Sequence, residues 1–490
     1  MFLKIKKQVL DLINTIEDML NVLLKLSNKK EYISDCILAC DAVLSIVNKE
    51  KNYPQNTIQI LEQVKTSFEK IYNDDTIIKK ENISGISKNI ILLKKTFDKE
   101  ITMQLNVVFL PYKVSMWDSL ETVYEAAIKD ENCSVKVVPI PYYQLNKNNK
   151  TPVYEGNRFP TDIPIVPFNE YSLDKEQPDI IFVHNIYDQY NTITQVFEEY
   201  FTENLKKYTD MLVYVPYHIS TFLKQEKGTV RCAYSLPGIN NVDKVILAGE
   251  HVKKEAIRDG VPKEKIITLG SPKFDGIVNR LNSPYSCPES WKEAIEGKTV
   301  YLLNTGCMYF AANPFEGVHY FTEFLSIPKL ETNSVVIWRP HPLTEASIIK
   351  FAPNLYNGYL KLKELVKNGD YLYKNIILDE TDDYIPALQI ADVLISGMSS
   401  ILQSYLVTEK KVLFWGTRME LKNSMLPSDV FYYAHDEYEP WYELIKKFPR
   451  GYDPLAKNRR GMVTKVYSNT DGTCGEKVYK AIKEAVLNKG

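Results

Sequence analysis

The sequence has few cysteines, no long apolar run and no excess of charge of either sign. Its 7 cysteines among 490 residues are scattered and odd in number, and none forms a Cys-x-x-Cys pair. This spacing argues against a disulfide framework or a zinc site, and it indicates a reducing compartment. No apolar run reaches the roughly 18 residues of a membrane span, and no apolar leader with a cleavage site opens the chain.

The formal net charge of -2 provides no global positive field that would collect nucleic-acid phosphates, which argues against a general nucleic-acid binder and leaves a local basic pocket open. A hydrophobic content of 44% and a charged content of 25% are ordinary for a soluble globular protein. The length is enough for two or three domains, each with its own core. We expect a cytoplasmic protein, and a peripheral position on the inner face of the plasma membrane stays open.

Glycine and proline are almost absent from residues 1–100, where apolar residues recur three and four positions apart. This pattern predicts helices at 2–24, 32–47, 54–72 and 86–97. We predict that residues 1–100 form a helical bundle or oligomerisation domain, through which the protein would form a homo-oligomer. Lysines near the start of the first helix leave contact with a membrane surface open, although acidic residues on the same helix argue against it.

Beyond residue 105, short apolar strands alternate with helices. Strands are predicted at 106–110, 135–138, 178–183, 211–215, 245–248 and 266–269, and helices at 117–128, 197–208 and 251–259. Such alternation is typical of a doubly wound α/β domain, which we place at 101–285. The proline-rich stretch 139–174 has no helical period and is predicted to be a long loop.

A second α/β series follows a turn-rich linker around 271–289. Its strands are predicted at 299–303, 335–338, 375–378, 393–396 and 412–415, and a final helix at 475–487. We place the second domain at 286–490, and the final helix packs back on the first domain as one option. The predicted fold class is therefore α/β, with two Rossmann-like doubly wound domains facing a cleft and preceded by an all-helical domain.

The loop Gly397-Met398-Ser399-Ser400 follows the strand at 393–396 and precedes a short helix from Ile401. Open α/β sheets bind ligands at the carboxyl ends of their strands, where this loop would lie. The serine hydroxyls and free backbone N–H groups would bind an anion there, with the helix dipole behind them. The alternative is that Ser399 and Ser400 only cap the helix.

Three other loops after strands carry polar residues: Pro216-Tyr217-His218, Gly270-Ser271-Pro272-Lys273 and Arg339-Pro340-His341-Pro342. Histidine, arginine and lysine suit an anionic ligand better than a metal, because carboxylates or thiols at ligand spacing are missing. We predict no metal and no cofactor. Each residue has a plainer alternative: a hydrogen-bonded histidine, an ion-paired Arg339, or Asp382 and Asp383 at a helix start.

Three motifs bring a family to mind: Gly270-Ser271-Pro272-Lys273-Phe274-Asp275, Arg339-Pro340-His341-Pro342 and the run 391–400, Ala-Asp-Val-Leu-Ile-Ser-Gly-Met-Ser-Ser. With them, the second half resembles the CDP-glycerol:poly(glycerophosphate) glycerophosphotransferases, the teichoic-acid-polymerase-like enzymes of Gram-positive bacteria. The resemblance covers roughly residue 105 to the C-terminus and leaves the helical block outside. It implies a GT-B fold in which the C-terminal domain holds most of the nucleotide donor.

The resemblance also implies roles for single residues. His218 matches the family's base toward the acceptor hydroxyl, although Ile219 stands where the family has glycine. His341 matches the histidine that meets the donor phosphates. Gly397 and Met398 stand where the family has aspartate and tyrosine before the paired serines, which leaves the identity of the donor open.

We therefore expect transfer of a glycerol-phosphate or related alditol-phosphate unit from a CDP-activated donor to a hydroxyl of a cell-surface polymer or lipid-linked glycan. The predicted catalytic residues are His218 and His341, and the predicted donor-binding residues are Arg339, Ser399, Ser400, Lys273, Gly397, Thr305 and Asp383. One alternative is a sugar-nucleotide glycosyltransferase or epimerase in which Glu380 or Asp383 grips the sugar. Another is a non-catalytic scaffold.

Overall fold

The structure of the protein is a computed structural model, and it describes residues 1–50, 52–74, 78–145, 149–219, 236–284, 287–421, 424, 426–435 and 439–488. The predicted boundary between 285 and 286 and the residue Cys232 lie outside the described residues. The cysteines within them are free thiols.

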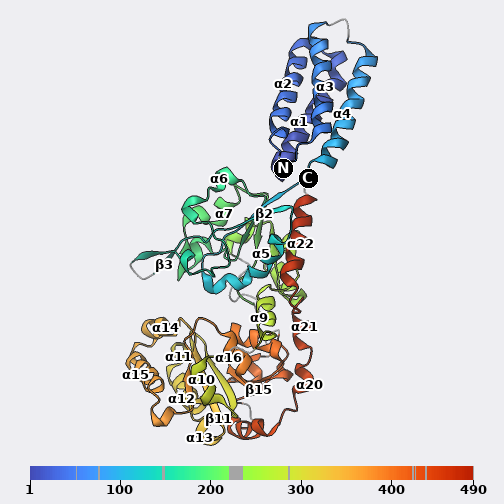
Figure 1. The fold of residues 1–490 in the computed structure, drawn as a ribbon. Helices are drawn as coiled ribbons and strands as arrows, with labels where there is room; N and C mark the ends of the chain where they lie inside the picture. Colours follow the sequence, from blue (N-terminus) through green and yellow to red (C-terminus); the bar gives the residue numbers. More distant parts are fainter. Residues whose placement is uncertain are drawn as a thin grey trace.

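Residues 1–100 form four long helices that stand apart from the rest of the molecule (Figure 1). Their bounds are α1 (Leu3–Val22), α2 (Lys29–Val47), α3 (Gln55–Asn73) and α4 (Lys80–Glu100). Each helix buries one apolar stripe; in α1 the stripe includes Val9, Ile13, Ile16 and Leu20, at the expected spacing of three and four residues. The helical start of the chain is therefore confirmed, and its self-association stays a prediction.

The first sheet is six-stranded and parallel, in the order β2-β1-β5-β7-β8-β9. The strands are β1 (Leu105–Phe109), β2 (Cys133–Val137), β5 (Ile180–Val183), β7 (Met211–Tyr214), β8 (Lys244–Ile246) and β9 (Ile266–Ile267). Every residue of β1, β5 and β7 is buried, as expected of parallel strands covered on both faces. The covering helices include α5 (Glu121–Ile128) and α8 (Glu250–Arg258).

The stretch 139–174 corrects the predicted long loop. It contains β3 (Tyr142–Leu145) and β4 (Lys150–Val153), which join β6 (Thr194–Val196) in a small antiparallel sheet. These strands are too short to show an alternating pattern, and Pro152 is tolerated because β4 is an edge strand. The helix predicted at 197–208 is also shorter, since only α7 (Thr202–Leu205) is α-helical there.

The second sheet is again six-stranded and parallel, in the order β12-β11-β10-β13-β14-β15. The strands are β10 (Thr299–Thr305), β11 (Ser334–Pro340), β12 (Ile376–Leu378), β13 (Val393–Ser396), β14 (Lys411–Phe414) and β15 (Tyr432–Tyr433). Helices around it include α10 (Glu289–Ile295), α12 (Pro314–Leu325), α14 (Thr344–Phe351), α15 (Tyr356–Lys367), α16 (Ile385–Ile390), α17 (Ser400–Tyr405) and α19 (Trp441–Lys447).

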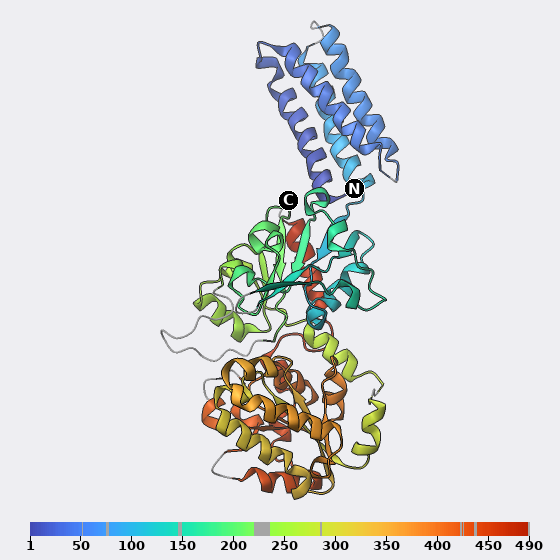
Figure 2. The same ribbon diagram turned by 90° about the vertical axis from the view of Figure 1, so that its left-hand side faces the viewer.

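The last helix, α22 (Cys474–Leu487), lies against α5 of the first sheet and far from the second sheet (Figures 1 and 2). Its buried residues, among them Val478 and Ile482, join the core that covers the first sheet. Its start is held by Asp275 of α9 (Lys273–Leu281), whose carboxylate accepts hydrogen bonds from the amides of Cys474 (3.0 Å) and Gly475 (2.7 Å).

The predicted fold class is confirmed: two Rossmann-like parallel sheets with helices on their faces, preceded by a helical segment. No helix within the described residues is both long and apolar enough to cross a membrane.

Candidate active site at the carboxyl ends of the two sheets

Each parallel sheet has one point at which the strand order changes direction. In the second sheet this point lies between β10 and β13, and in the first sheet it lies between β1 and β5. Neighbouring crossover loops leave such a point in opposite directions, which opens space for a ligand at the carboxyl ends of the strands.

Three predicted residues meet at the switch point of the second sheet. The backbone amide of His341 donates to the carbonyl of Thr305 (2.9 Å), so the loop after β11 is fastened to the end of β10. The Nδ2 atom of Asn304 donates to the hydroxyls of Ser396 (3.1 Å) and Ser399 (3.0 Å), which fastens the loop after β13 to the same strand. The sequence thus brings Thr305, His341 and Ser399 together.

The sequence left open whether Ser399 and Ser400 cap the following helix or bind an anion, and the structure places the two serines differently. The Ser399 hydroxyl accepts a hydrogen bond from the Leu402 amide (3.1 Å), so Ser399 is the N-cap of α17. Ser400 is the first residue of the helix and is exposed. Ser399 therefore caps the helix, Ser400 is an exposed residue at the switch point, and donor binding by either serine stays a prediction.

Gly397 makes room for an aromatic side chain. A Cβ atom at this position would lie 2.4 Å from Nε1 of Trp415, which follows β14. The Trp415 ring also contacts Tyr309, at 4.4 Å between ring centroids. Packing against Trp415 is enough to explain the glycine, and donor binding by Gly397 stays a prediction.

His341 presents a defined tautomer. Its Nδ1 atom accepts a hydrogen bond from the Leu343 amide (3.0 Å), so in the neutral ring the proton lies on Nε2. Burial lowers the pKa of His341, which favours this neutral form. An Nε2–H group at the end of β11 can donate a hydrogen bond to a phosphate oxygen.

Arg339 is committed to the protein itself. Its guanidinium forms an ion pair with the fully buried carboxylate of Asp379 and donates to the carbonyl of Thr381 (2.7 Å). The ion-pair alternative therefore describes Arg339 in this structure, and contact with the donor stays a prediction. Asp383 likewise accepts a hydrogen bond from the Ile385 amide (3.0 Å) and pairs with Arg280.

Lys273 lies at the joint between the two α/β domains. Its ammonium is 2.7 Å from the carboxylate of Asp118, which follows β1, and 5.6 Å from the ring centroid of Tyr384, which follows β12. The Tyr384 hydroxyl donates to the same Asp118 carboxylate (3.3 Å). The Lys273 side chain is 11% exposed. Its pKa is raised because Asp118 outweighs the cost of burial.

Loops from the carboxyl ends of both sheets meet here. Besides the Asp118–Tyr384 hydrogen bond, Arg158 lies 3.7 Å from Asp382, and Arg280 of α9 pairs with Asp383. The two sheets therefore turn their ligand-binding edges toward one another. This orientation lets residues of both domains act on one substrate pair.

His218 follows β7 on the first sheet. Burial lowers its pKa to about 4, and the positive charge of Lys273 adds to this shift. Its Nδ1 atom is buried and has no hydrogen-bond partner among the residues that the structure describes. An unpartnered buried nitrogen is rare in folded proteins, and the role of His218 as a base stays a prediction.

His184, which the sequence analysis missed, lies beside His218. It follows β5 directly, so the rule that selected His218 should also have selected His184. Its Nε2 atom accepts a hydrogen bond from the Tyr112 amide (3.2 Å), and its fully buried ring has its pKa lowered to about 3 by burial. The ring of Tyr217 lies between the two histidines, 6.3 Å from His184 and 5.0 Å from His218.

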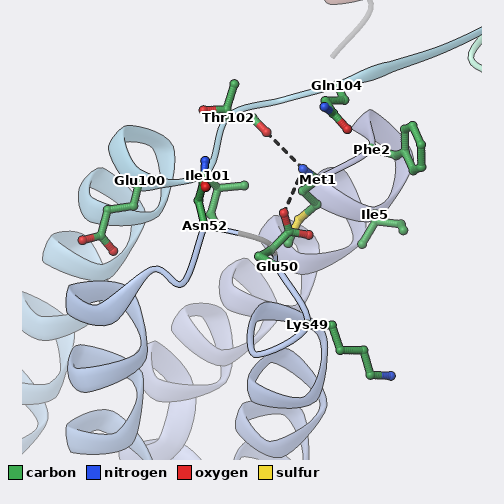
Figure 3. A pocket seen from close by; sticks show the side chains of 10 residues that line it. All are labelled: Met1, Phe2, Ile5, Lys49, Glu50, Asn52, Glu100, Ile101, Thr102 and Gln104. Carbon is green, nitrogen blue, oxygen red and sulfur yellow. Dashed lines mark hydrogen bonds and ion pairs between the residues drawn. The ribbon is translucent and has the colours of Figure 1, made fainter. Parts of the chain in front are cut away.

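A pocket of about 320 Å³ lies elsewhere, at the foot of the helical bundle (Figure 3). The α-amino group of Met1 points into it and contacts the Glu50 carboxylate (3.0 Å) and the Thr102 carbonyl (3.1 Å). The other lining residues come from the start of the chain and α1, from the connection between α2 and α3, from the end of α4 and from the chain before β1. None of the predicted site residues lines this pocket, which marks the junction of the bundle with the first sheet.

Within the described residues, no group of three or more histidine, cysteine, aspartate or glutamate side chains is placed to hold a metal ion. At the edge of the second sheet, the Nε2–H group of His341 and the hydroxyl of Ser400 are groups that can donate hydrogen bonds to an anion.

No family model and no curated protein matches the sequence. Among solved structures, the chain is similar to the wall teichoic acid polymerase TagF, with 16% identity, a TM-score of 0.48, and coverage of 86% of this chain and 98% of that chain. It is also similar to a putative UDP-N-acetylglucosamine 2-epimerase from Listeria monocytogenes (13% identity, TM-score 0.48, coverage 79% and 97%). The MnaA-UDP structure from S. aureus has 12% identity and a TM-score of 0.49, with coverage of 79% and 97%.

TagF is a teichoic acid polymerase, as are the enzymes that the motifs resemble, and its similarity extends over most of the chain at low identity. These identities and TM-scores are too low to assign an activity. The function proposed below rests on the residues of this chain.

Proposed function

We propose that the protein transfers a glycerol-phosphate or related alditol-phosphate unit from a CDP-activated donor to a hydroxyl of a cell-surface polymer or lipid-linked glycan. The observation that carries the proposal is that the facing edges of the two sheets hold different kinds of side chain. The edge of the second sheet gathers His341 Nε2–H and the exposed residue Ser400 at a switch point. The edge of the first sheet holds His218, whose Nδ1 atom has no hydrogen-bond partner among the described residues.

In this proposal the acceptor oxygen attacks the phosphorus atom that bears the alditol. The new phosphorus–oxygen bond forms as the bond to the CMP oxygen breaks, and CMP leaves with the electron pair. His218 takes the proton of the acceptor hydroxyl. His341 and Ser400 donate hydrogen bonds to the donor diphosphate as negative charge grows on CMP. No metal, cofactor or covalent enzyme intermediate is part of the proposal.

The joint at Lys273 supports the proposal from a different direction. General-base catalysis requires a neutral imidazole. Burial, and to a smaller extent the ammonium of Lys273, keeps His218 neutral, and the same lowered pKa makes it a weaker base than an ordinary histidine. Lys273 would thus act on the base through its field rather than as a ligand of the donor. The same side chain ties together the two domains that must meet for transfer.

Carboxylates that an epimerase or glycosyltransferase would use on a sugar are already occupied. Glu380 pairs with Lys363 (2.5 Å) and Lys367 (2.6 Å), and Asp383 pairs with Arg280. A sugar-nucleotide reaction is therefore kept as an outcome of the test. We expect the reaction to run in the cytoplasm, with a lipid-linked acceptor reached at the inner face of the plasma membrane.

Calorimetric titration with CDP-glycerol, CMP and UDP tests the donor. We expect CDP-glycerol and CMP to bind, UDP not to bind, and His341→Ala and Ser400→Ala to weaken CDP-glycerol binding. Thr322→Ala on α12, whose hydroxyl donates to Val318 within the helix (2.7 Å), is the matched control. Arg339→Ala is a poor probe because it leaves the buried Asp379 carboxylate without its cation.

A preference for UDP would favour sugar transfer or epimerisation. The absence of binding by any of the three nucleotides would contradict the proposal and favour a scaffold.

A further inference from the structure

Lys113 lies at the switch point of the first sheet. It follows β1 by four residues, and its neighbour Tyr112 donates its amide to His184 at the end of β5. The chain is fixed on the other side by the Val114 amide, which donates to Glu155 (3.0 Å). Lys113 therefore projects from a firmly held loop on the edge that also carries His218.

The ammonium of Lys113 is surrounded by aromatic rings. It lies 5.1 Å from the ring centroid of Tyr142 and 6.0 Å from that of Tyr112. The side chain is half-buried. Among the described residues it forms no ion pair and no hydrogen bond, so the three ammonium protons have no fixed acceptor.

Glu155 is the carboxylate whose charge acts on Lys113, and its oxygens are already in use. Oε1 accepts the hydroxyl of Tyr142 (2.7 Å), Oε2 accepts the Val114 amide, and Arg158 lies 3.9 Å from Oε1. Burial lowers the pKa of Lys113 more than Glu155 raises it. Glu155 thus fixes the loop without neutralising the lysine.

Other partly buried lysines of the chain differ from Lys113. Lys265 and Lys410, whose pKa burial also lowers, each donate to two backbone carbonyls. Lys363 is held between two glutamates. The ammonium of Lys113 is partly desolvated, lies near two tyrosine rings and has no hydrogen-bond acceptor among the described residues. Such a group is suited to bind an anion.

We propose that Lys113 binds a phosphate group of the acceptor, and this proposal rests on the transfer reaction proposed above. β1 and β7 are separated by one strand, so the ends of the two strands that lead to Lys113 and His218 lie about two strand spacings, roughly 10 Å, apart along the edge. A phosphate at Lys113 would thus belong to the acceptor unit behind the hydroxyl that His218 deprotonates. Lys113 would select acceptors that already carry phosphate over neutral polyols and sugars.

Binding measurements on the full chain test this assignment with sn-glycerol 3-phosphate, glycerol and CMP as probes. The variants are Lys113→Met, Lys113→Arg and, as the control, Lys150→Met. Lys150 also lies over a tyrosine ring, 5.8 Å from the centroid of Tyr143, but it is exposed and donates to Gln195 (2.9 Å).

We expect Lys113→Met to bind glycerol 3-phosphate at least about tenfold more weakly, the effect of one charge-assisted hydrogen bond. Lys113→Arg should keep most of the affinity, and Lys150→Met should behave as wild type. CMP binding should not change. The melting temperature of Lys113→Met should be equal to or above that of wild type, because the substitution removes a desolvated charge that has no ion-pair partner.

Wild-type affinity of Lys113→Met for glycerol 3-phosphate would overturn the proposal. A parallel loss of CMP binding would also overturn it, because Lys113 would then belong to the donor site. Failure of the transfer reaction itself would show separately, as missing CDP-glycerol binding with the Lys113-dependent phosphate site intact.

Discussion

The two six-stranded parallel sheets differ in strand order and in the chemistry at their carboxyl ends: numbered along each sheet's own strands, the order is 2-1-3-4-5-6 in the first sheet and 3-2-1-4-5-6 in the second. The edge of the first sheet buries neutral imidazoles among tyrosine rings, with His184 and His218 on either side of Tyr217. The edge of the second sheet holds hydroxyls and a helix start around Asn304 and Ser399. The first environment suits proton transfer, and the second suits an anion.

The difference follows from burial. The His184 and His218 rings are so enclosed that their pKa values fall to about 3 and about 4. Ser400, in contrast, is exposed, and its hydroxyl can exchange water for a ligand. Our proposal therefore assigns the base to the first domain and the donor-binding hydroxyls to the second.

Of the variants considered, replacement of His218 should have the largest effect, because it removes the proposed base from the edge of the first sheet. His218→Gln should lower the rate of transfer from CDP-glycerol about 10²–10⁴-fold, the usual contribution of a general base, while CDP-glycerol binding stays unchanged. Single-turnover kinetics with calorimetry measure the two quantities. His319→Gln, which removes an exposed imidazole on α12, should keep full activity; equal losses in both variants would refute the role of His218.

Lys273 tests whether the two edges depend on their joint. Lys273→Met leaves the Asp118 carboxylate without its cation, and we expect the free energy of unfolding to fall by about 3 kcal/mol. Chemical denaturation measures the change. The double variant with Asp118→Asn should recover part of the loss, since the two groups are coupled; simple additivity of the two losses would show that the ion pair is not the cause.

Lowering the pH should decrease the free energy of unfolding, because the buried histidines at the edge of the first sheet resist protonation in the folded state. The folded-state pKa of His218 is about 4, below the ordinary 6.5, so the unfolded chain binds its proton first as the pH falls. The contribution of His218 to stability is therefore present above pH 6.5 and declines between pH 6.5 and 4, by about 1.4 kcal/mol per pH unit.

The measurement is the free energy of unfolding against pH for wild type and His218→Gln. Asp179, whose pKa is raised to about 6 by burial, changes stability in the opposite sense in the same range, but equally in both proteins. The difference between the two curves isolates the histidine. Superimposable curves would contradict the prediction.

The smallest expected effect separates the two serines of the second edge. Ser399→Ala removes the N-cap of α17 and should lower the free energy of unfolding by about 1 kcal/mol. Ser400→Ala should leave stability unchanged and weaken only donor binding. Thermal unfolding and calorimetry of the two variants check this division, and a stability loss for Ser400→Ala would contradict it.

Most strands could be predicted because parallel strands are buried on both faces and read as apolar runs, as 211–215 and 393–396 show. The small antiparallel sheet could not, because β3 and β4 are four-residue strands within a proline-rich stretch. The chemistry of single loops was visible in the sequence, but not which partners each side chain meets.

The contact between the two α/β domains at Lys273 illustrates why side-chain partners could not be predicted from the sequence. Asp118, Lys273 and Tyr384 come from three distant parts of the chain, and no local pattern links them. Arg339 and Asp383 were selected for charge, and the structure gives both of them protein partners. His184 shows the reverse case, since its position after β5 was readable and was overlooked.

The return of α22 to the first sheet makes the second α/β domain an insertion within the first. During synthesis on the ribosome, the first domain must therefore wait for its last helix until the whole second domain has emerged. Its core around Val107, Val123 and Phe182 would stay partly uncovered over that interval. Chaperones that bind apolar surface on nascent chains could therefore bind this uncovered core for as long as the second domain is being synthesised. The second domain would have time to fold before the first is complete.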